Sequence, residues 1–216
     1  MVALIMLCAL VCTVPLILIC GTIAPLRGES GLVIFADDFV ATFQFKEDAT
    51  RFLEAVKERF ALFGLELEPS KTRLVEFGRF AEENRKKRGE GKPETFDFLG
   101  FTHYCSRSHK TGKFRMKRKT AQKKYRMKLK EMNTWIKQNR HRRLKDLTSR
   151  LNLKLRGHYQ YYGITDNSKS IGNFLDETKR MLFKWLNRAF TAISMADKES
   201  NLFVRSRMRE ICTSDL

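Results

Sequence analysis

Two adjacent acids interrupt an apolar, β-rich run between residues 32 and 43, and this pattern restricts the local fold more than any other in the chain. Leu32-Val33-Ile34 precedes the acids, and Phe39-Val40-Ala41-Thr42-Phe43 follows them. Both runs are rich in the β-branched and aromatic residues that are typical of strands. The sequence therefore predicts a tight hairpin with Asp37 and Asp38 at its tip.

Two carboxylates at one turn are candidate metal ligands. Their mutual repulsion favours a bound cation, and Mg²⁺ usually takes one or two carboxylates together with water and substrate phosphates. We therefore expect Asp37 and Asp38 to hold Mg²⁺ for nucleotidyl transfer, in which two ions about 4 Å apart activate the attacking oxygen and hold the leaving one. The alternative is a solvated Asp-Asp turn without chemistry.

Positive charge is concentrated in the middle of the chain. The formal net charge is +18, and the stretch Arg107–Lys130 holds twelve basic residues and no acid. Such a stretch repels itself unless a polyanion neutralises it, and nucleic acid is the polyanion that we expect. An anionic membrane surface and an unusual solubility patch are the alternatives. The residues expected to contact nucleic acid are Arg107, Lys110, Lys113, Arg115, Lys117, Arg118, Lys119, Lys123, Lys124, Arg126, Arg142, Arg143 and Arg156.

Other common kinds of site have no signature in the sequence. The five cysteines and four histidines are scattered without the spacing of a disulfide framework or a metal site. There is also no Gly-rich phosphate loop, nucleophile elbow or zinc finger.

The N-terminal segment differs in composition from the rest of the chain. Residues 1–26 contain no charged side chain, and Met1–Ile23 is almost entirely apolar and long enough to span a bilayer. The segment lacks the basic n-region of a signal peptide. If it spanned a membrane, the basic residues after it would keep the remainder cytoplasmic. We expect a cytoplasmic protein, with a membrane anchor at residues 1–24 as the lesser alternative.

Apolar spacing predicts a mixed first part of the chain. An amphipathic helix is expected over Lys46–Phe63, with Gly64 ending it. Alternation and turn residues predict the elements that follow. These are strands at Leu65–Leu67 and Arg73–Phe77, a surface loop over residues 80–94, and an apolar strand at Phe96–Phe101 whose Gly100 permits close backbone approach.

The second part is expected to be helical. From Thr120 onward glycine and proline nearly vanish until Gly157, and apolar residues recur at helical spacing. A last helix is expected over Ile171–Phe190.

Four blocks in this order resemble the reverse transcriptase and maturase proteins encoded by bacterial group II introns. Phe35–Val40 resembles the tyrosine-alanine-aspartate-aspartate motif with phenylalanine in place of tyrosine. Gly64–Leu67 with Ser70-Lys71-Thr72 looks like the next polymerase block. Phe96–Phe101 is similar to the primer-grip strand pair, and Arg156–Gly163 resembles the signature of the maturase-specific thumb, called domain X.

The resemblance implies an α+β fold, with a partial reverse-transcriptase palm of antiparallel sheet and packed helix followed by an α-helical thumb or maturase domain. Asp37 would be the main Mg²⁺ ligand, with Asp38 second or supporting, and Lys71 would lie near the phosphates of the incoming nucleotide. Phe98, Leu99 and Gly100 would hold the primer end.

The resemblance also implies nucleic-acid partners, namely intron or template RNA and primer DNA. The basic segment would track the RNA backbone. Tyr159, Tyr161 and Tyr162 would pack in the thumb core or stack on bases, and core packing is the favoured interpretation.

The chain departs from the family pattern before the paired acids. In the family an earlier palm strand supplies a further metal-binding aspartate, whereas here Glu29 is the single acid among the 36 residues before Asp37. We expect a palm sheet that lacks neighbouring strands, no fingers, and no polymerisation by this chain alone unless a separately encoded N-terminal half completes it. A truncated or frameshifted copy would explain this pattern.

The expected organisation has four parts. Residues 1–24 are an apolar segment unrelated to the family, residues 25–105 a partial palm, residues 106–192 a basic connector and helical thumb, and residues 193–216 a tail. The expected function is that of a fragment of a group II intron reverse transcriptase and maturase. The alternatives are a non-catalytic module that binds intron RNA and a membrane-anchored basic protein.

Overall fold

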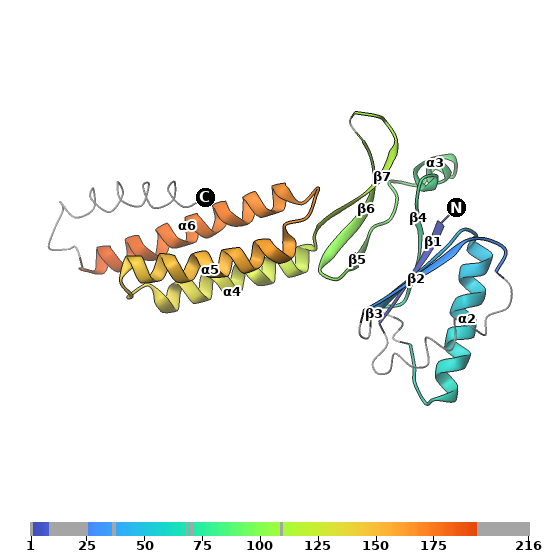
Figure 1. The fold of residues 1–216 in the computed structure, drawn as a ribbon, viewed down its shortest axis with the longest axis horizontal. Helices are drawn as coiled ribbons and strands as arrows, with labels where there is room; N and C mark the ends of the chain where they lie inside the picture. Colours follow the sequence, from blue (N-terminus) through green and yellow to red (C-terminus); the bar gives the residue numbers. More distant parts are fainter. Residues whose placement is uncertain are drawn as a thin grey trace. The chain divides into compact units, whose positions relative to one another are not determined.

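The computed structural model of the chain describes residues 2–8, 26–35, 38–67, 69, 71–108 and 110–193, with the backbone alone for residues 2–8 and 189–193. The chain falls into two compact units, divided between Ala121 and Gln122 (Figure 1). The first unit combines sheets and helices and the second is helical, so the predicted α+β class is confirmed.

A four-stranded antiparallel sheet forms the centre of the first unit. Its strand order is β2-β3-β1-β4. Its strands are β1 Val2–Cys8, β2 Ser30–Phe35, β3 Asp38–Phe43 and β4 Arg73–Phe77. β2 and β3 form the predicted hairpin, in which Phe35 pairs with Asp38 next to the turn.

Helix α2, Lys46–Leu62, covers one face of this sheet (Figure 1). Successive strand residues point to opposite faces, so every second residue of β3 turns toward the helix. The predicted helix is confirmed, and its end at Phe63 is followed by Gly64 with a φ of +65°. The core between them consists of Phe39, Ala41 and Phe43 of β3, Ala49, Phe52, Val56 and Phe60 of α2, and Leu67.

Two of the predicted elements between α2 and the second sheet are wrong. Leu65–Leu67 is irregular rather than a strand, because Leu67 turns inward to complete the core under α2. Residues 80–94 include helix α3, Ala81–Lys87, in place of a continuous loop. Acids in its first turn and bases in its last turn suit the helix dipole, which favours this short helix despite its polarity.

A second sheet of three antiparallel strands follows, in the order β5-β6-β7. Its strands are β5 Phe96–Phe98, β6 Phe101–Arg107 and β7 Phe114–Thr120. The single strand predicted over Phe96–Phe101 is wrong, because Leu99 and Gly100 have φ values of 49° and 77° and form a two-residue hairpin turn. The positive φ of Gly100 suits this left-handed turn position.

A second apolar cluster lies on the face of the first sheet that α2 does not cover. Val40 of β3 and Val75 and Phe77 of β4 are buried there with Phe96 of β5. Strands β5 and β6 therefore pack against the sheet that carries Asp38. The first unit continues to Ala121, so it includes β7.

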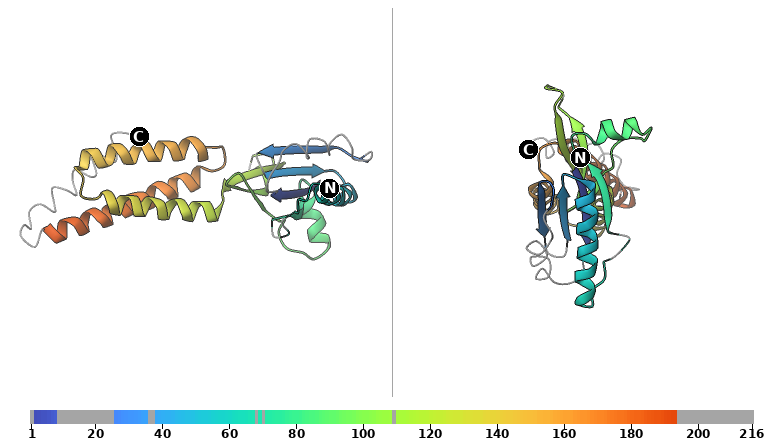
Figure 2. Two further views of the ribbon diagram at one scale, coloured as in Figure 1. Left: turned by 90° about the horizontal axis from the view of Figure 1, so that it is seen from below. Right: turned by 90° about the vertical axis from the view of Figure 1, so that its right-hand side faces the viewer.

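Three helices make up the described part of the second unit (Figure 2). They are α4 Gln122–Asn139, α5 Leu144–Tyr162 and α6 Ser168–Ile193. The predicted helical half is confirmed. Its core consists of Met132, Ile136, Leu147, Leu151, Leu155, Phe174, Leu182 and Leu186.

The N-terminal segment contributes a strand. β1 lies between β3 and β4, so the expectation of a palm sheet without neighbouring strands is wrong. Val2–Cys8 is extended rather than part of a spanning helix, because its backbone pairs with both neighbours. No helix in the described part of the chain is long and apolar enough to cross a membrane.

Candidate functional site

Asp38 lies at one end of the four-stranded sheet, beside the β2–β3 turn. It is the first residue of β3, it is partly exposed, and it pairs with Phe35 of β2. On the other neighbouring strand, the register of β1 places Cys8 opposite Asp38. The second predicted ligand, Asp37, lies outside the described residues.

The predicted phosphate-binding residue Lys71 lies at the same end of the sheet. Arg73, the first residue of β4, pairs with Met6 of β1. Lys71 precedes β4 by two residues, so the exposed Lys71 lies toward the end of the sheet that carries Asp38, on the far side of β1.

β1 adds no carboxylate to this end of the sheet, since Val2–Cys8 contains no acid. Among the residues that the structure describes, no three His, Cys, Asp or Glu side chains form a group that would hold a metal ion. The adjacent pair Asp37-Asp38 matches the one or two carboxylates that Mg²⁺ usually takes from a protein. The residues present thus fit one Mg²⁺ and lack the further carboxylate that the family pattern places on an earlier strand.

The predicted primer-grip residues form the β5–β6 turn. Leu99 and Gly100 occupy its two left-handed positions. The Gly100 carbonyl accepts a hydrogen bond of 2.9 Å from the Ala121 backbone, which ties the turn to the end of β7. Phe98 packs against the second apolar cluster. This turn is therefore well anchored on both sides.

His103 supports the strands behind that turn. Its ring stacks on Phe96 with ring centres 4.7 Å apart and an interplanar angle of 6°. Burial is the main reason that the pKa of His103 lies below its ordinary value, and the positive charge of Arg118 acts in the same direction. The stacking and partial burial of its ring make His103 a structural support for these strands.

Strand β7 sorts the predicted basic residues onto two faces. Lys117 lies opposite Tyr104, and Lys119 lies two residues further along the same face. Lys119 Nζ lies 5.5 Å from the centre of the Tyr104 ring. Arg118 lies on the other face, opposite His103. One face of the hairpin therefore presents cations beside an aromatic ring.

Arg107 has acidic neighbours. Its guanidinium lies 3.2 Å from a Glu82 carboxylate oxygen and 3.6 Å from one of Glu83, both on α3. About half of each of these side chains is exposed, so these pairs contribute little to stability. The two glutamates nevertheless neutralise the positive charge of Arg107, which was predicted to contact nucleic acid.

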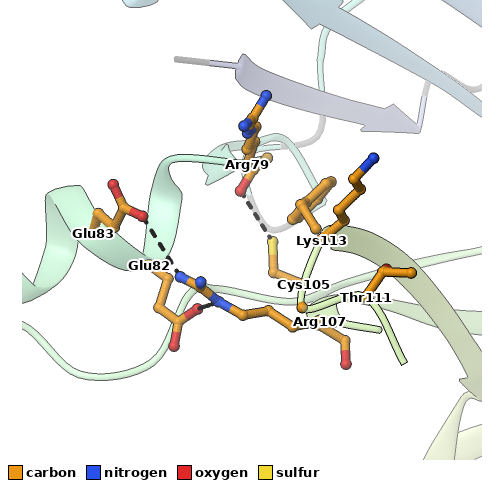
Figure 3. A pocket seen from close by; sticks show the side chains of 11 residues that line it. Arg79, Glu82, Glu83, Cys105, Arg107, Thr111 and Lys113 are labelled. Carbon is orange, nitrogen blue, oxygen red and sulfur yellow. Dashed lines mark hydrogen bonds and ion pairs between the residues drawn. The ribbon is translucent and has the colours of Figure 1, made fainter. Parts of the chain in front are cut away.

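A cavity of about 340 Å³ lies between α3 and the β6–β7 hairpin (Figure 3). Arg79 and Lys113 line it together with the Arg107 ion pairs. The Cys105 thiol also lines it and donates a hydrogen bond of 3.7 Å to the Gly78 carbonyl. Burial raises the pKa of Cys105, so this thiol is not activated as a nucleophile.

The other predicted basic residues lie on exposed surfaces. Lys123, Lys124 and Arg126 begin α4, and that helix has no acid in its first turn. Cations at a helix N-terminus oppose the helix dipole. Their arrangement therefore costs stability unless an anion offsets it. Further exposed positions are Lys110, Lys113, Arg115, Arg142, Arg143 and Arg156.

The three tyrosines of the domain X signature differ in environment. Tyr162 is buried at 6% exposure, and Tyr159 packs against the helical core, as core packing predicts. Burial raises the pKa of Tyr159, whose hydroxyl is buried and forms no hydrogen bond with the described residues. Tyr161 is 55% exposed, so it alone can stack on a base. His158 is stacked on Phe174 with ring centres 3.9 Å apart.

Tyr104 was not singled out from the sequence. It becomes a candidate because the β6–β7 register brings it beside Lys117 and Lys119. The two-residue alternation in β6 and β7 shows which residues of each strand share a face, but it does not give the register between the two strands.

Two family models match the chain. Residues 12–103 match the family described as reverse transcriptase (RNA-dependent DNA polymerase). Residues 122–202 match the family described as group II intron, maturase-specific domain. The first match includes residues 12–24, within the segment that the sequence motifs had set apart as unrelated. A comparison with curated protein sequences finds no significant match.

Proposed function

The chain belongs to the group II intron reverse transcriptase and maturase family, and we propose that in its present form it acts chiefly by binding intron RNA. The observation that carries this proposal is the acid-free basic stretch Arg107–Lys130. Strand β7 and the start of α4 display most of its cations on exposed surfaces.

The positive charge at the start of α4 is not balanced by an acid in its first turn. Lys123 and Lys124 lie in that turn, at the positive end of the helix dipole. Each such placement costs roughly 0.3–1 kcal/mol at low ionic strength. Phosphates along an RNA backbone would offset this cost and release counterions, which adds affinity.

We further propose that Asp37 and Asp38 hold Mg²⁺, with Lys71 at the phosphate side of the same sheet end. When bound, the ion would neutralise phosphate oxygens and lower the pKa of an attacking hydroxyl. Asp38 would orient the ion from the start of β3, and Phe98, Leu99 and Gly100 would hold the primer DNA end at the β5–β6 turn.

Polymerisation would need more than this chain supplies. β1 fills the central strand position with Val2–Cys8 and brings no carboxylate. We therefore propose that this chain alone does not extend a primer, and that any activity would need a separately encoded N-terminal half. A cytoplasmic location remains a prediction.

RNA binding is tested by measuring affinity for a transcribed intron RNA and for heparin at a series of salt concentrations. The proposal expects a steep loss of RNA affinity with salt and no change in the Asp37→Asn variant. Equal affinity for heparin would contradict a specific maturase role.

The catalytic proposal is tested by primer extension on an RNA template with Mg²⁺, with and without the N-terminal half. Extension by this chain alone would contradict it.

A further inference from the structure

Gly157 lies inside helix α5 at an exposed position where packing gives no reason for a glycine. Apart from its chain neighbours and the backbone of α5, no described atom would lie within 4 Å of a Cβ at this position. Glycine in a helix interior lowers the folding equilibrium constant about four- to fivefold relative to alanine. The described part of the chain therefore loses stability at Gly157 without gaining a contact.

The side of α5 that carries Gly157 also presents two large side chains. Leu153 lies four residues before Gly157 and Tyr161 four residues after it, so all three lie on the same side of the helix. Leu153 is 67% exposed and Tyr161 is 55% exposed. The Tyr161 ring is held edge-on against Tyr162, with ring centres 4.8 Å apart. A partner lying across this side would meet open helix backbone between two exposed side chains.

Two cations border the same side of α5. Arg150 lies about two turns before Gly157 and Lys154 nearly one turn before it, and both are exposed. Lys154 Nζ lies 5.2 Å from the centre of the Trp135 ring, which partly orients the ammonium group. The one acid of α5 is Asp146, in the first turn. Positive charge therefore predominates along this side of the helix around Gly157.

We propose that the sugar-phosphate backbone of RNA crosses α5 at Gly157, with Arg150 and Lys154 holding its phosphates. The missing Cβ lets a ligand approach the helix backbone closely. Charge selects the partner, because a second copy of this chain would also carry a net charge of +18 and be repelled, whereas RNA is complementary. The inference rests on the proposed RNA-binding function and names the crossing point on the helical unit.

The test enlarges Gly157 in the full chain. Leucine is a good helix former, so Gly157→Leu should raise the midpoint of thermal unfolding by about 4 °C. The same variant should bind RNA about tenfold more weakly, because leucine displaces the backbone from two cations. Gly157→Ala should show the same two opposite changes with a smaller loss of affinity. The probe is a short fluorescein-labelled oligouridylate, followed by anisotropy at several salt concentrations.

Gly172 supplies a matched control. It is an exposed glycine of α6, and a Cβ there would also meet no described atom within 4 Å. The residue four positions after it is Asp176, an acid, where Gly157 is followed by Tyr161. Gly172→Leu should therefore raise the unfolding midpoint as well and leave the affinity for oligouridylate unchanged.

The two cations are tested by Arg150→Gln with Lys154→Gln. Loss of two phosphate contacts on a single strand lowers the slope of log K against log salt by about 1.4. Adding Gly157→Leu to this variant should lose little further affinity, because the leucine and the two charge changes remove the same contacts. Such non-additivity is expected of groups that act on one contact.

Four results would overturn the inference. They are an unchanged RNA affinity in Gly157→Leu, an equal loss in Gly172→Leu, fully additive losses in the combined variant, and self-association that Gly157→Leu abolishes while RNA affinity stays intact. The slope of the Arg150→Gln and Lys154→Gln variant, which keeps Gly157, remains decisive if Gly157→Leu fails to fold. Failure of the unsubstituted chain to bind oligouridylate or any other RNA would instead remove the proposed function itself.

Discussion

Neutralising the cations on the Tyr104 face of β7 should reduce RNA affinity more than the same charge change elsewhere in the first unit. Of these cations Lys119 is exposed and Lys117 is partly exposed. Lys117 and Lys119 share the face that carries Tyr104, and the register places Arg118 on the opposite face. The informative variant is therefore Lys117→Gln with Lys119→Gln, rather than a block substitution of all three residues.

The expected magnitude follows from the number of charges on that face. If each lysine meets one phosphate, the slope of log K against log salt falls by about 1.4 for single-stranded RNA and about 1.8 for a duplex. At moderate salt the affinity should fall by roughly tenfold. The Arg118→Gln variant should lose less than half of this, because its side chain lies on the His103 face.

The assay is fluorescence anisotropy of a labelled RNA at a series of salt concentrations. The matched control is Lys86→Gln with Lys87→Gln, which removes two exposed charges from α3. The glutamates in the first turn of α3 already reduce the positive electrostatic potential around these two lysines. Equal losses in the control and in the β7 variant would refute the reasoning, since net charge rather than the arrangement on β7 would then govern binding.

Three further outcomes are expected. Phe60→Ala should lower the free energy of unfolding by about 3–5 kcal/mol in chemical denaturation, because Phe60 is 1% exposed in the core under α2, and a loss below about 1 kcal/mol would contradict that packing. Burial lowers the pKa of His103 and His158, so the unfolded chain binds more protons, and the free energy of unfolding should fall as the pH drops below about 6.5. A His158→Phe variant should show less of this fall. A curve of unfolding free energy against pH identical to that of the unsubstituted protein would argue against this role of His158. Alkaline carbonate should release the chain from membranes, whereas retention in the membrane pellet would support an anchor at residues 1–24.

Much of the helical half could be predicted because its signal is local. Apolar residues recur at helical spacing in α4, α5 and α6, and the same residues form the core. The β2–β3 hairpin could also be predicted from the sequence, because two β-rich runs flank the adjacent pair of acids. In these segments the period of the apolar pattern and the fold agree.

The parts that escaped prediction depend on distant pairing. Val2–Cys8 reads equally well as a helix or a strand, and its partners β3 and β4 decide between them. Leu65–Leu67 alternates like a strand, but Leu67 packs into the core under α2 and the segment pairs with no strand that the structure describes. The hydrogen bond from Trp185 of α6 to Asn133 of α4 likewise joins two residues that lie 52 positions apart in sequence.

The two sheets end in edge strands of opposite character. β7 closes the second sheet with a row of lysines and arginines, and charged residues on an edge discourage pairing with strands of other molecules. β2 closes the first sheet with no charged residue, and Val33 and Phe35 are 56% and 61% exposed there. The cations of β7 that we propose to contact RNA thus also disfavour pairing of this strand with other molecules, whereas β2 carries no charge that would do so. We therefore expect β2 to favour association of copies of this chain at high concentration, and Val33→Lys should raise the concentration at which the protein stays monodisperse.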